Sequence, residues 1–143
     1  HGKMIASCDQ NLHVWDPRTQ QRILNLSHKN NFKGTQCLDN STVVALSTVS
    51  NRFCVVDTRT GGVVSEWNLP IQTIKGFHVT SDNKHVFAGS DSGLITALDF
   101  RTGEVLNQWR AHDSSVLKVD WFSNYLVSSS TDKTVRKWDL KGT

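Results

Sequence analysis

The sequence predicts an all-β chain in which one four-stranded antiparallel unit recurs about every forty residues. Two observations support this prediction: an end motif that repeats, and short segments of β-forming residues that lie between turns. The clearest segments are TVVALS at 42–47, HVFAGS at 85–90 and YLVSSS at 125–130. No window of the sequence shows a sustained helical period of apolar residues, so we expect no helices.

The end motif recurs four times. The segments HVWD, CVVD, TALD and RKWD end at Asp16, Asp57, Asp99 and Asp139, at intervals of 41, 42 and 40 residues. The residues after the aspartate also repeat, as DPRTQ, DTRTG and DFRTG in the first three units. Trp67 and Trp109 hold the same place in consecutive units. Self-similarity at a fixed period is the signature of a repeat architecture.

The expected strands are best defined in the last unit. We place them at 116–122, 125–130 and 134–140, with a further strand at 104–110 leading in. Turn-forming residues, such as those of SDSG and TDK, separate neighbouring strands. Short strands at this regular spacing favour an array of antiparallel sheets.

The last unit resembles the WD40 repeat family. It runs from A-H-D-S-S-V at 111–116 to the Trp-Asp pair at 138–139, and a repeat of about 40–45 residues with a Trp-Asp end is typical of that family. The resemblance extends along the chain and implies β-propeller blades, each a four-stranded antiparallel sheet. The expected units are a partial repeat at 1–16, repeats at 17–57, 58–99 and 100–139, and the start of another at 140–143.

The resemblance also implies a hydrogen-bonded structural set, whose positions in the last unit fall on His112, Ser128, Asp132 and Trp138. Such a set gives each buried polar atom a partner and ties the blade across its strands. The earlier units depart from this pattern. They have Ile5 at the serine position of the first unit, Ser50 and Val56 at the aspartate and tryptophan positions of the second, and Ser92 and Leu98 at those of the third.

The length of the chain is small for a closed ring. At about 41 residues per unit, its 143 residues supply roughly three and a half units, whereas propellers close with about four to eight blades. The chain also begins at His1 and inside a unit. We therefore expect part of a larger propeller, of seven blades by analogy with the family. Its other blades would come from the parent chain or from a second copy.

The composition argues against several classes of function. A net charge of +3 is too small to indicate a nucleic-acid partner, and Lys133, Arg136 and Lys137 are interpreted as a solvated edge. No apolar run approaches the roughly 20 residues of a membrane-spanning helix, so we expect no membrane insertion. The cysteines and histidines show no metal-ligand spacing, and no metal or other cofactor is expected. Free thiols in strands favour a cytoplasmic or nuclear location.

Catalysis within the chain is not expected either. GSDSG at 89–93 has glycine-flanked serines, but it lies between two strands rather than before the helix that a nucleophile elbow requires. His112 is interpreted as the structural histidine of the repeat and not as a general base. No nucleophile, base and orienting group occur together, so we predict neither enzyme activity nor a small-molecule substrate.

The predicted binding surface is one rim of the blades, because loops on a rigid scaffold usually carry function. By resemblance to the family, partners contact the loops between blades and the turns between the second and third strands of each blade. The candidate residues are Phe32 and Ile71 as apolar anchors, Asp91 and Asp113 as acceptors for a basic peptide, and Thr131.

The function that follows is a protein–protein interaction scaffold or adaptor, which presents rim loops to other proteins or peptides within a multiprotein complex. Two alternatives remain. One is a nucleic-acid or chromatin-binding WD40 module, whose binding would depend strongly on salt. The other is a non-catalytic propeller appended to an enzyme.

Overall fold

The computed structural model describes residues 4–8, 11–27, 32–38, 42–47, 52–69 and 73–139. These residues form strands and turns and no helix. The strands are β1 (Ile5–Cys8), β2 (Asn11–Asp16), β3 (Gln21–Ser27), β4 (Phe32–Cys37), β5 (Thr42–Ser47), β6 (Arg52–Asp57), β7 (Gly62–Asn68), β8 (Ile74–Val79), β9 (His85–Ser90), β10 (Leu94–Asp99), β11 (Val105–Arg110), β12 (Val116–Phe122), β13 (Tyr125–Ser130) and β14 (Val135–Asp139). The prediction of an all-β fold is confirmed.

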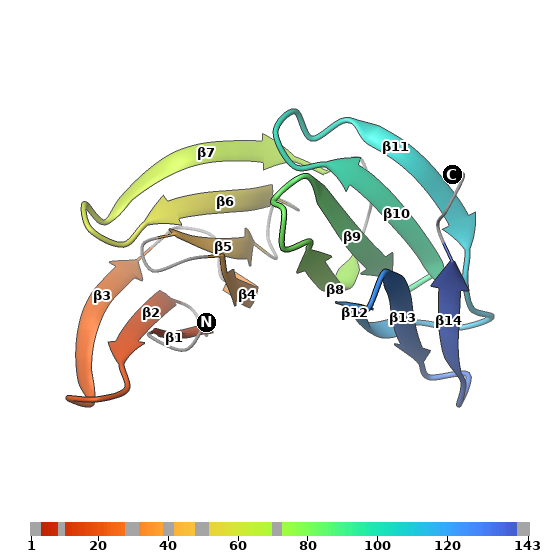
Figure 1. Cartoon of the computed structure of the whole chain (residues 1–143), viewed down its shortest axis with the longest axis horizontal. Helices are drawn as coiled ribbons and strands as arrows, with labels where there is room; N and C mark the ends of the chain where they lie inside the picture. The colour runs from red at the N-terminus through yellow and green to blue at the C-terminus, as the bar shows by residue number, and fades with distance from the viewer. Residues whose placement is uncertain are drawn as a thin grey trace. The chain divides into compact units, whose positions relative to one another are not determined.

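The strands form antiparallel sheets in which neighbours in sequence are neighbours in space (Figure 1). The chain divides into two compact units, His1–Pro70 and Ile71–Thr143. In the first unit, β1–β3 make a three-stranded sheet and β4–β7 a four-stranded one. In the second unit, β8–β11 make a four-stranded sheet and β12–β14 a three-stranded one. Both four-stranded sheets are therefore simple meanders, as expected for propeller blades.

One expected strand belongs to a different sheet from the one predicted. The strand at 104–110 forms as β11, but it pairs with β10, with Leu94 opposite Arg110, and thus completes the β8–β11 sheet. The repeat length is measured from one aspartate to the next. It does not show at which strand one sheet ends and the next begins. Three of the four sheets consequently cross a boundary between sequence repeats, because their last strands, β3, β7 and β11, lie after Asp16, Asp57 and Asp99.

The repeated aspartates make the tight turn that joins the last two strands of a sheet. The Oδ1 atom accepts the backbone N–H two residues further on, at 2.9 Å for Asp16 and Arg18, 2.9 Å for Asp57 and Arg59, and 2.8 Å for Asp99 and Arg101. The aspartate carbonyl oxygen accepts a second bond, from the N–H of Gln20, Gly61 or Gly103. Aspartate favours such turns because its short side chain bonds the backbone locally.

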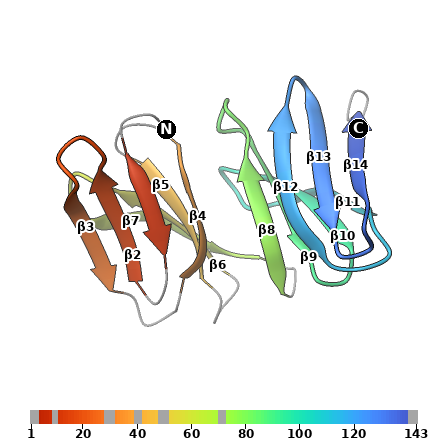
Figure 2. The ribbon, with the colours of Figure 1, turned by 90° about the horizontal axis from the view of Figure 1, so that it is seen from below.

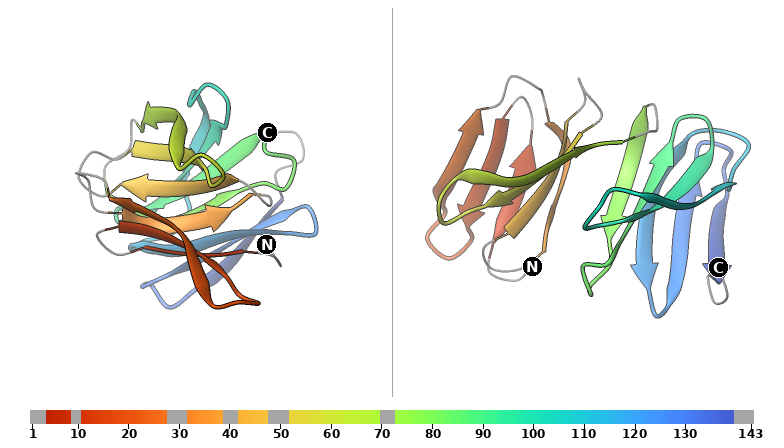
Figure 3. Two further views of the ribbon diagram at one scale, coloured as in Figure 1. Left: turned by 90° about the vertical axis from the view of Figure 1, so that its left-hand side faces the viewer. Right: turned by 90° about the horizontal axis from the view of Figure 1, so that it is seen from above.

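The core of the second unit lies between its two sheets, where β12 lies beside β8 and β9 (Figures 2 and 3). Its buried members are Phe87, Ile95, Ala97, Ala111, Val116, Val119 and Leu126. Aromatic contacts extend this core from one sheet to the next. Trp121 stacks on Phe87 with ring centroids 5.5 Å apart, and Trp109 meets Trp138 edge to face at 5.8 Å.

Candidate functional site

The structure brings His112, Ser128, Asp132 and Trp138 together in the last sheet. The side chain of His112, which is 1% exposed, projects from the loop that follows β11. Its Nε2 atom lies 2.7 Å from the Ser128 hydroxyl, and its Nδ1 atom lies 3.1 Å from the Asp132 carboxylate. The Trp138 indole N–H donates to the same Ser128 hydroxyl at 3.0 Å. These bonds link the loop to β13, to β14 and to the turn between them.

Thr134 is a fifth member of this set that the sequence reasoning missed. Its hydroxyl donates to Asp132 Oδ1 at 2.5 Å and lies 3.0 Å from His112 Nδ1. The hydrogen bond from the Thr134 hydroxyl is the main reason that the pKa of Asp132 lies far below its usual range, and the backbone N–H groups of Asp113 and Thr134 add to it. The D-x-T spacing of this turn could have indicated the role of Thr134.

The first sheet has a tryptophan–serine bond that the sequence reasoning placed wrongly. Counting back from Trp15 puts Ile5 at the serine position, but Trp15 Nε1 donates to the Ser7 hydroxyl at 3.1 Å. The reason is the length of the turn. Two residues separate β1 from β2, whereas four separate β13 from β14, so the same place in the sheet has a different spacing from the tryptophan.

The loop between β11 and β12 is held between two turns by backbone hydrogen bonds. The Gly93 carbonyl accepts the N–H groups of Ala111 and His112, at 2.9 and 3.1 Å. On the other side, the Thr131 N–H donates to the Ser115 carbonyl at 3.0 Å. Gly93 has a φ of +89°, and a Cβ atom there would lie 2.2 Å from the His112 carbonyl oxygen. Only glycine fits this close approach.

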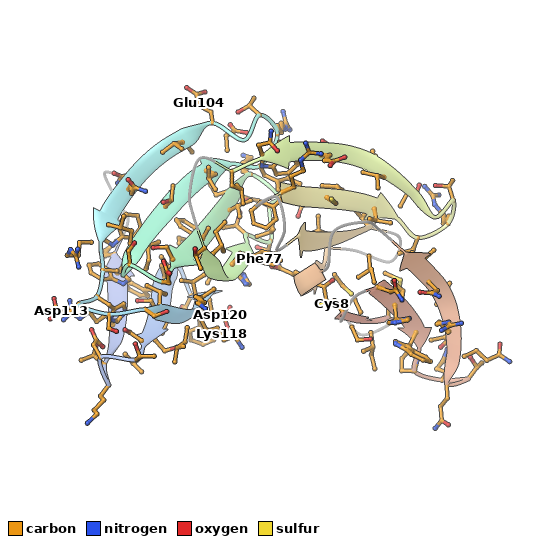
Figure 4. The ribbon with its side chains drawn as sticks, turned by 180° about the vertical axis from the view of Figure 1, so that it is seen from behind. Cys8, Phe77, Glu104, Asp113, Lys118 and Asp120 are labelled. Atoms are coloured by element: carbon orange, nitrogen blue, oxygen red, sulfur yellow. The ribbon has the colours of Figure 1, made fainter. Side chains whose placement is uncertain are left out.

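We define the polar rim as Asp91, Ser92, Asp113, Ser114 and Thr131, which lie in this loop and in the two turns that hold it. The hydroxyls of Ser114 and Thr131 are 2.7 Å apart. Asp91, Asp113 and Thr131 are all exposed. Figure 4 labels Asp113 at the end of β11, opposite to the end at which Glu104 lies. The structure thus gathers three of the five predicted rim residues at one end of the second unit.

The structure does not describe the side chains of the other two predicted rim residues, Phe32 and Ile71. Ile71 lies outside the described residues. Phe32 is the first residue of β4, but the position of its side chain is outside what the structure describes. The turn at 49–51 and the residue Ser50 also lie outside the described ranges.

Two family models match the chain. One, described as "Outer membrane protein assembly factor BamB", matches residues 16–110, and the other, described as "WD domain, G-beta repeat", matches residues 103–139. The second match coincides with the unit that holds the bonded set from His112 to Trp138. The chain belongs to the WD40 repeat family. The BamB model matches more than half of this WD40 chain, so the chain also belongs to the family that this model describes.

Curated relatives resemble nearly the whole WD40 chain. "Probable inactive serine/threonine-protein kinase lvsG" of Dictyostelium discoideum is 32% identical over 165 residues, covering 96% of this chain and 7% of that protein. "WD repeat-containing protein 81" of Homo sapiens is 30% identical over 145 residues, covering 94% of this chain and 7% of that protein. The chain therefore spans a small part of the length of these relatives. Their family is generally non-catalytic, and its repeats are in general protein-interaction modules.

A solved structure shows the same fold. The computationally designed Ika4 protein matches with a TM-score of 0.74 and 24% identity, over 96% of this chain and 85% of the designed one. At this level of identity the likeness concerns the fold alone.

The basic residues near the last strands have separate roles in the WD40 chain. Arg136 donates from Nη1 to the Ala111 carbonyl at 2.8 Å and so helps to hold the β11–β12 loop. The Lys137 ammonium lies 3.7 Å from the centre of the Tyr125 ring, a cation–π contact. Neighbouring side chains of a strand point to opposite faces of the sheet, which is why these two do not form one patch.

The described part of the WD40 chain holds no group of three or more metal-ligating side chains, and no helix there could span a membrane. Ser92, the serine of GSDSG whose flanking residues resemble those of a nucleophile, bonds to another serine rather than to a base. The Ser92 hydroxyl lies 2.8 Å from the Ser90 hydroxyl, within the turn between β9 and β10. This hydrogen bond is structural, since it closes the turn.

Proposed function

We propose that this WD40 chain is a protein-interaction scaffold or adaptor that binds partner proteins at the polar rim, without catalysis. The observation that supports it is the exposure of Asp91, Asp113 and Thr131 on backbone that hydrogen bonds hold in place. A surface that is ordered before binding loses little conformational entropy when a partner docks. Two exposed carboxylates favour a partner segment that carries basic side chains.

The proposal extends to where the chain acts and with what. Its three cysteines, Cys8, Cys37 and Cys54, are not joined in disulfides, which favours the reducing conditions of the cytoplasm or nucleus. Further blades, from the same polypeptide or from a second copy, are part of the proposed assembly. The solution mass of the chain, measured by light scattering, distinguishes a second copy from a single one.

Charge reversal at the rim tests the proposal. The full chain serves as bait in a cross-linking pull-down, as wild type, as Asp91→Lys with Asp113→Lys, and as Glu104→Lys. Glu104 is the matched control, because it is an exposed carboxylate at the opposite end of β11. We expect a defined partner that the wild type and the control retain and that the double variant loses at least about fivefold, or about 1 kcal/mol.

Three results would contradict the proposal. The first is equal capture by all three baits, which would place the interface elsewhere. The second is capture that depends on nucleic acid and falls steeply with salt, because that behaviour belongs to a nucleic-acid module. The third is turnover of a substrate by the chain. All three altered carboxylates are exposed, so the unfolding free energy should change by less than about 0.5 kcal/mol.

A further inference from the structure

A cleft lies in the second unit, at the end of the sheets away from the polar rim. Its volume is about 630 Å³. It is lined by the turn between β8 and β9, by residues of β9, β10 and β11, and by the end of β12 with its following turn. The strands of a meander alternate in direction, so these turns and the polar rim lie at opposite ends of the same sheets. The cleft is thus a separate surface from the polar rim.

Aromatic side chains make up much of the lining of this cleft. Phe87 and Trp121 line it as a stacked pair with an interplanar angle of 3°, and Trp109 lies beside them. His85 stacks in turn on Phe87, with ring centroids 6.5 Å apart. Aromatic rings have a negative face, which attracts a cation that lies over it.

The polar lining of the cleft carries one ionised group, the Asp82 carboxylate. Its Oδ1 atom accepts hydrogen bonds from the Thr80 hydroxyl, at 2.5 Å, and from the Lys84 backbone N–H, at 3.0 Å. These bonds, the one from Thr80 above all, hold the pKa of Asp82 below its usual range, so the carboxylate is charged at neutral pH. No other hydrogen bond to it occurs among the described residues, which leaves Oδ2 available to a ligand.

The charge of the lining selects the ligand. Among the described residues that line the cleft, none is a lysine or an arginine. The remaining polar groups are His85, Asn107, Asn124, two hydroxyls and the indole N–H groups of Trp109 and Trp121. The exposed Lys84 does not line the cleft, and its charge is the smallest of the causes that lower the pKa of Asp82. An anionic group would therefore meet Asp82 without a positive partner, whereas a cation would meet both a carboxylate and aromatic faces.

We propose that this cleft binds a basic side chain of a partner polypeptide, arginine in preference to lysine, with Asp82 pairing to the charge and the Trp109 and Trp121 rings packing against it. Arginine is favoured because its planar guanidinium both stacks on rings and offers a fork of donors to a carboxylate. The volume exceeds that of one side chain, so a short segment around the arginine enters with it.

The direct test follows the indole N–H signals of the full chain by NMR while a peptide is added. The probe is acetyl-Gly-Arg-Gly-amide, and its matched control is the same peptide with citrulline, which keeps the shape of arginine without the charge. A glutamate peptide and a lysine peptide complete the set. We expect the arginine peptide to shift the Trp109 and Trp121 signals, with Trp15 and Trp67 of the first unit as internal references.

Two variants then assign the charge. Asp82→Asn should weaken arginine binding at least tenfold. Glu104→Gln should leave it unchanged, because Glu104 is an exposed carboxylate at the same end of the sheet as the cleft but does not line it. Asn124→Asp should tighten binding several-fold, because it adds a second carboxylate to the lining. Asn124 has a φ of +67°, which aspartate also tolerates. This gain of binding keeps the test decisive if Asp82→Asn folds poorly.

Several outcomes would overturn the assignment. Equal shifts with citrulline would show that charge plays no part, and stronger shifts with glutamate would reverse the sign of the site. Shifts of all five tryptophans would mean that the peptide perturbs the fold, and no shift at Trp109 or Trp121 would mean that the cleft does not bind arginine. None of these results bears on the polar rim, whose variants are tested separately by partner capture.

Discussion

Ser128 connects the indole of Trp138 to the imidazole of His112 in the last sheet. Its side chain is fully buried, and its hydroxyl accepts the Trp138 indole N–H and lies 2.7 Å from His112 Nε2. On the other side of the ring, Nδ1 lies within hydrogen-bonding distance of Asp132 and Thr134. A carboxylate can only accept, so Nδ1 is the nitrogen that donates to Asp132. Separate partners thus hold the two sides of one buried ring.

Replacing Ser128 by alanine should lower the free energy of unfolding by about 1–3 kcal/mol. The change leaves a buried indole N–H and a buried imidazole nitrogen without partners, and an unmade hydrogen bond in a core is costly. Urea unfolding followed by circular dichroism measures the loss. Ser129→Ala, at the next position of β13, is the matched control. A loss no larger than that of the control would mean that the set does not stabilise the sheet.

Asp132 should make the stability of the chain depend on acid. Hydrogen bonds, first from the Thr134 hydroxyl, lower the pKa of its folded-state carboxylate below the unfolded value of about 4. Its contribution is therefore fully present above about pH 4 and is lost as the pH falls through the folded-state value.

The unfolding free energy of the wild type and of Asp132→Asn, measured between about pH 6 and pH 3, checks this sign. The wild type should lose more stability than the variant as the pH falls through this range. Parallel curves for the two proteins would show that Asp132 has the same pKa in the folded and unfolded states.

At the scale of the element, the D-x-R-T-G hairpin is the part of the repeat with the clearest local cause. The fifth position adopts a left-handed backbone in all three copies, with φ values of 59° at Gln20, 72° at Gly61 and 73° at Gly103. Glycine adopts this conformation without steric cost, whereas a side chain there approaches its own backbone. Gln20 is thus the strained member of the series.

Gln20→Gly should raise the free energy of unfolding by about 0.5–1 kcal/mol, since relief of the left-handed strain exceeds the extra entropy of the unfolded chain. The reciprocal change Gly103→Gln should lower it by about 1 kcal/mol. Chemical denaturation of both variants measures the two signs, and equal signs would contradict the explanation.

At the scale of the whole molecule, each unit has its own apolar core. Met4, Leu12, Val14, Cys54 and Val56 form the buried cluster of the first unit. Cys54 is only 1% exposed, and burial, aided by the nearby charge of Glu66, raises the pKa of its thiol to about 11. Its reactivity therefore reports on whether the first unit is open.

In a chain that keeps only Cys54, through Cys8→Ser and Cys37→Ser, the native thiol should react with a disulfide reagent at about pH 8 roughly a hundredfold slower than in urea. Burial blocks the reagent, and the raised pKa removes the thiolate. The measurement is the rate at which the reagent releases its own coloured thiol, followed by absorbance. A native rate near that of the unfolded chain would mean that this core opens readily.

The sequence alone determined the class of fold and most strand positions. The segments at 42–47, 85–90 and 125–130 are the strands β5, β9 and β13, because alternating β-forming residues between turn residues are a local signal. The repeated aspartates were predicted as the ends of units, and the structure shows that Asp16, Asp57 and Asp99 begin hairpin turns. The positions of His112, Ser128, Asp132 and Trp138 came from the resemblance to the WD40 family, and the structure places these side chains within hydrogen-bonding distance.

Only the tertiary structure shows which sheet a strand joins and which side chains meet, because the spacing of residues in the sequence does not determine either. The sheet that β11 completes and the hydrogen bond from the Trp15 indole to the Ser7 hydroxyl depend on turn lengths and on strand register. These differ between units with the same period. The aromatic cleft joins side chains from β9, β11 and β12, far apart in sequence. Such a surface arises when sheets pack against each other, so no local pattern in the sequence predicts it.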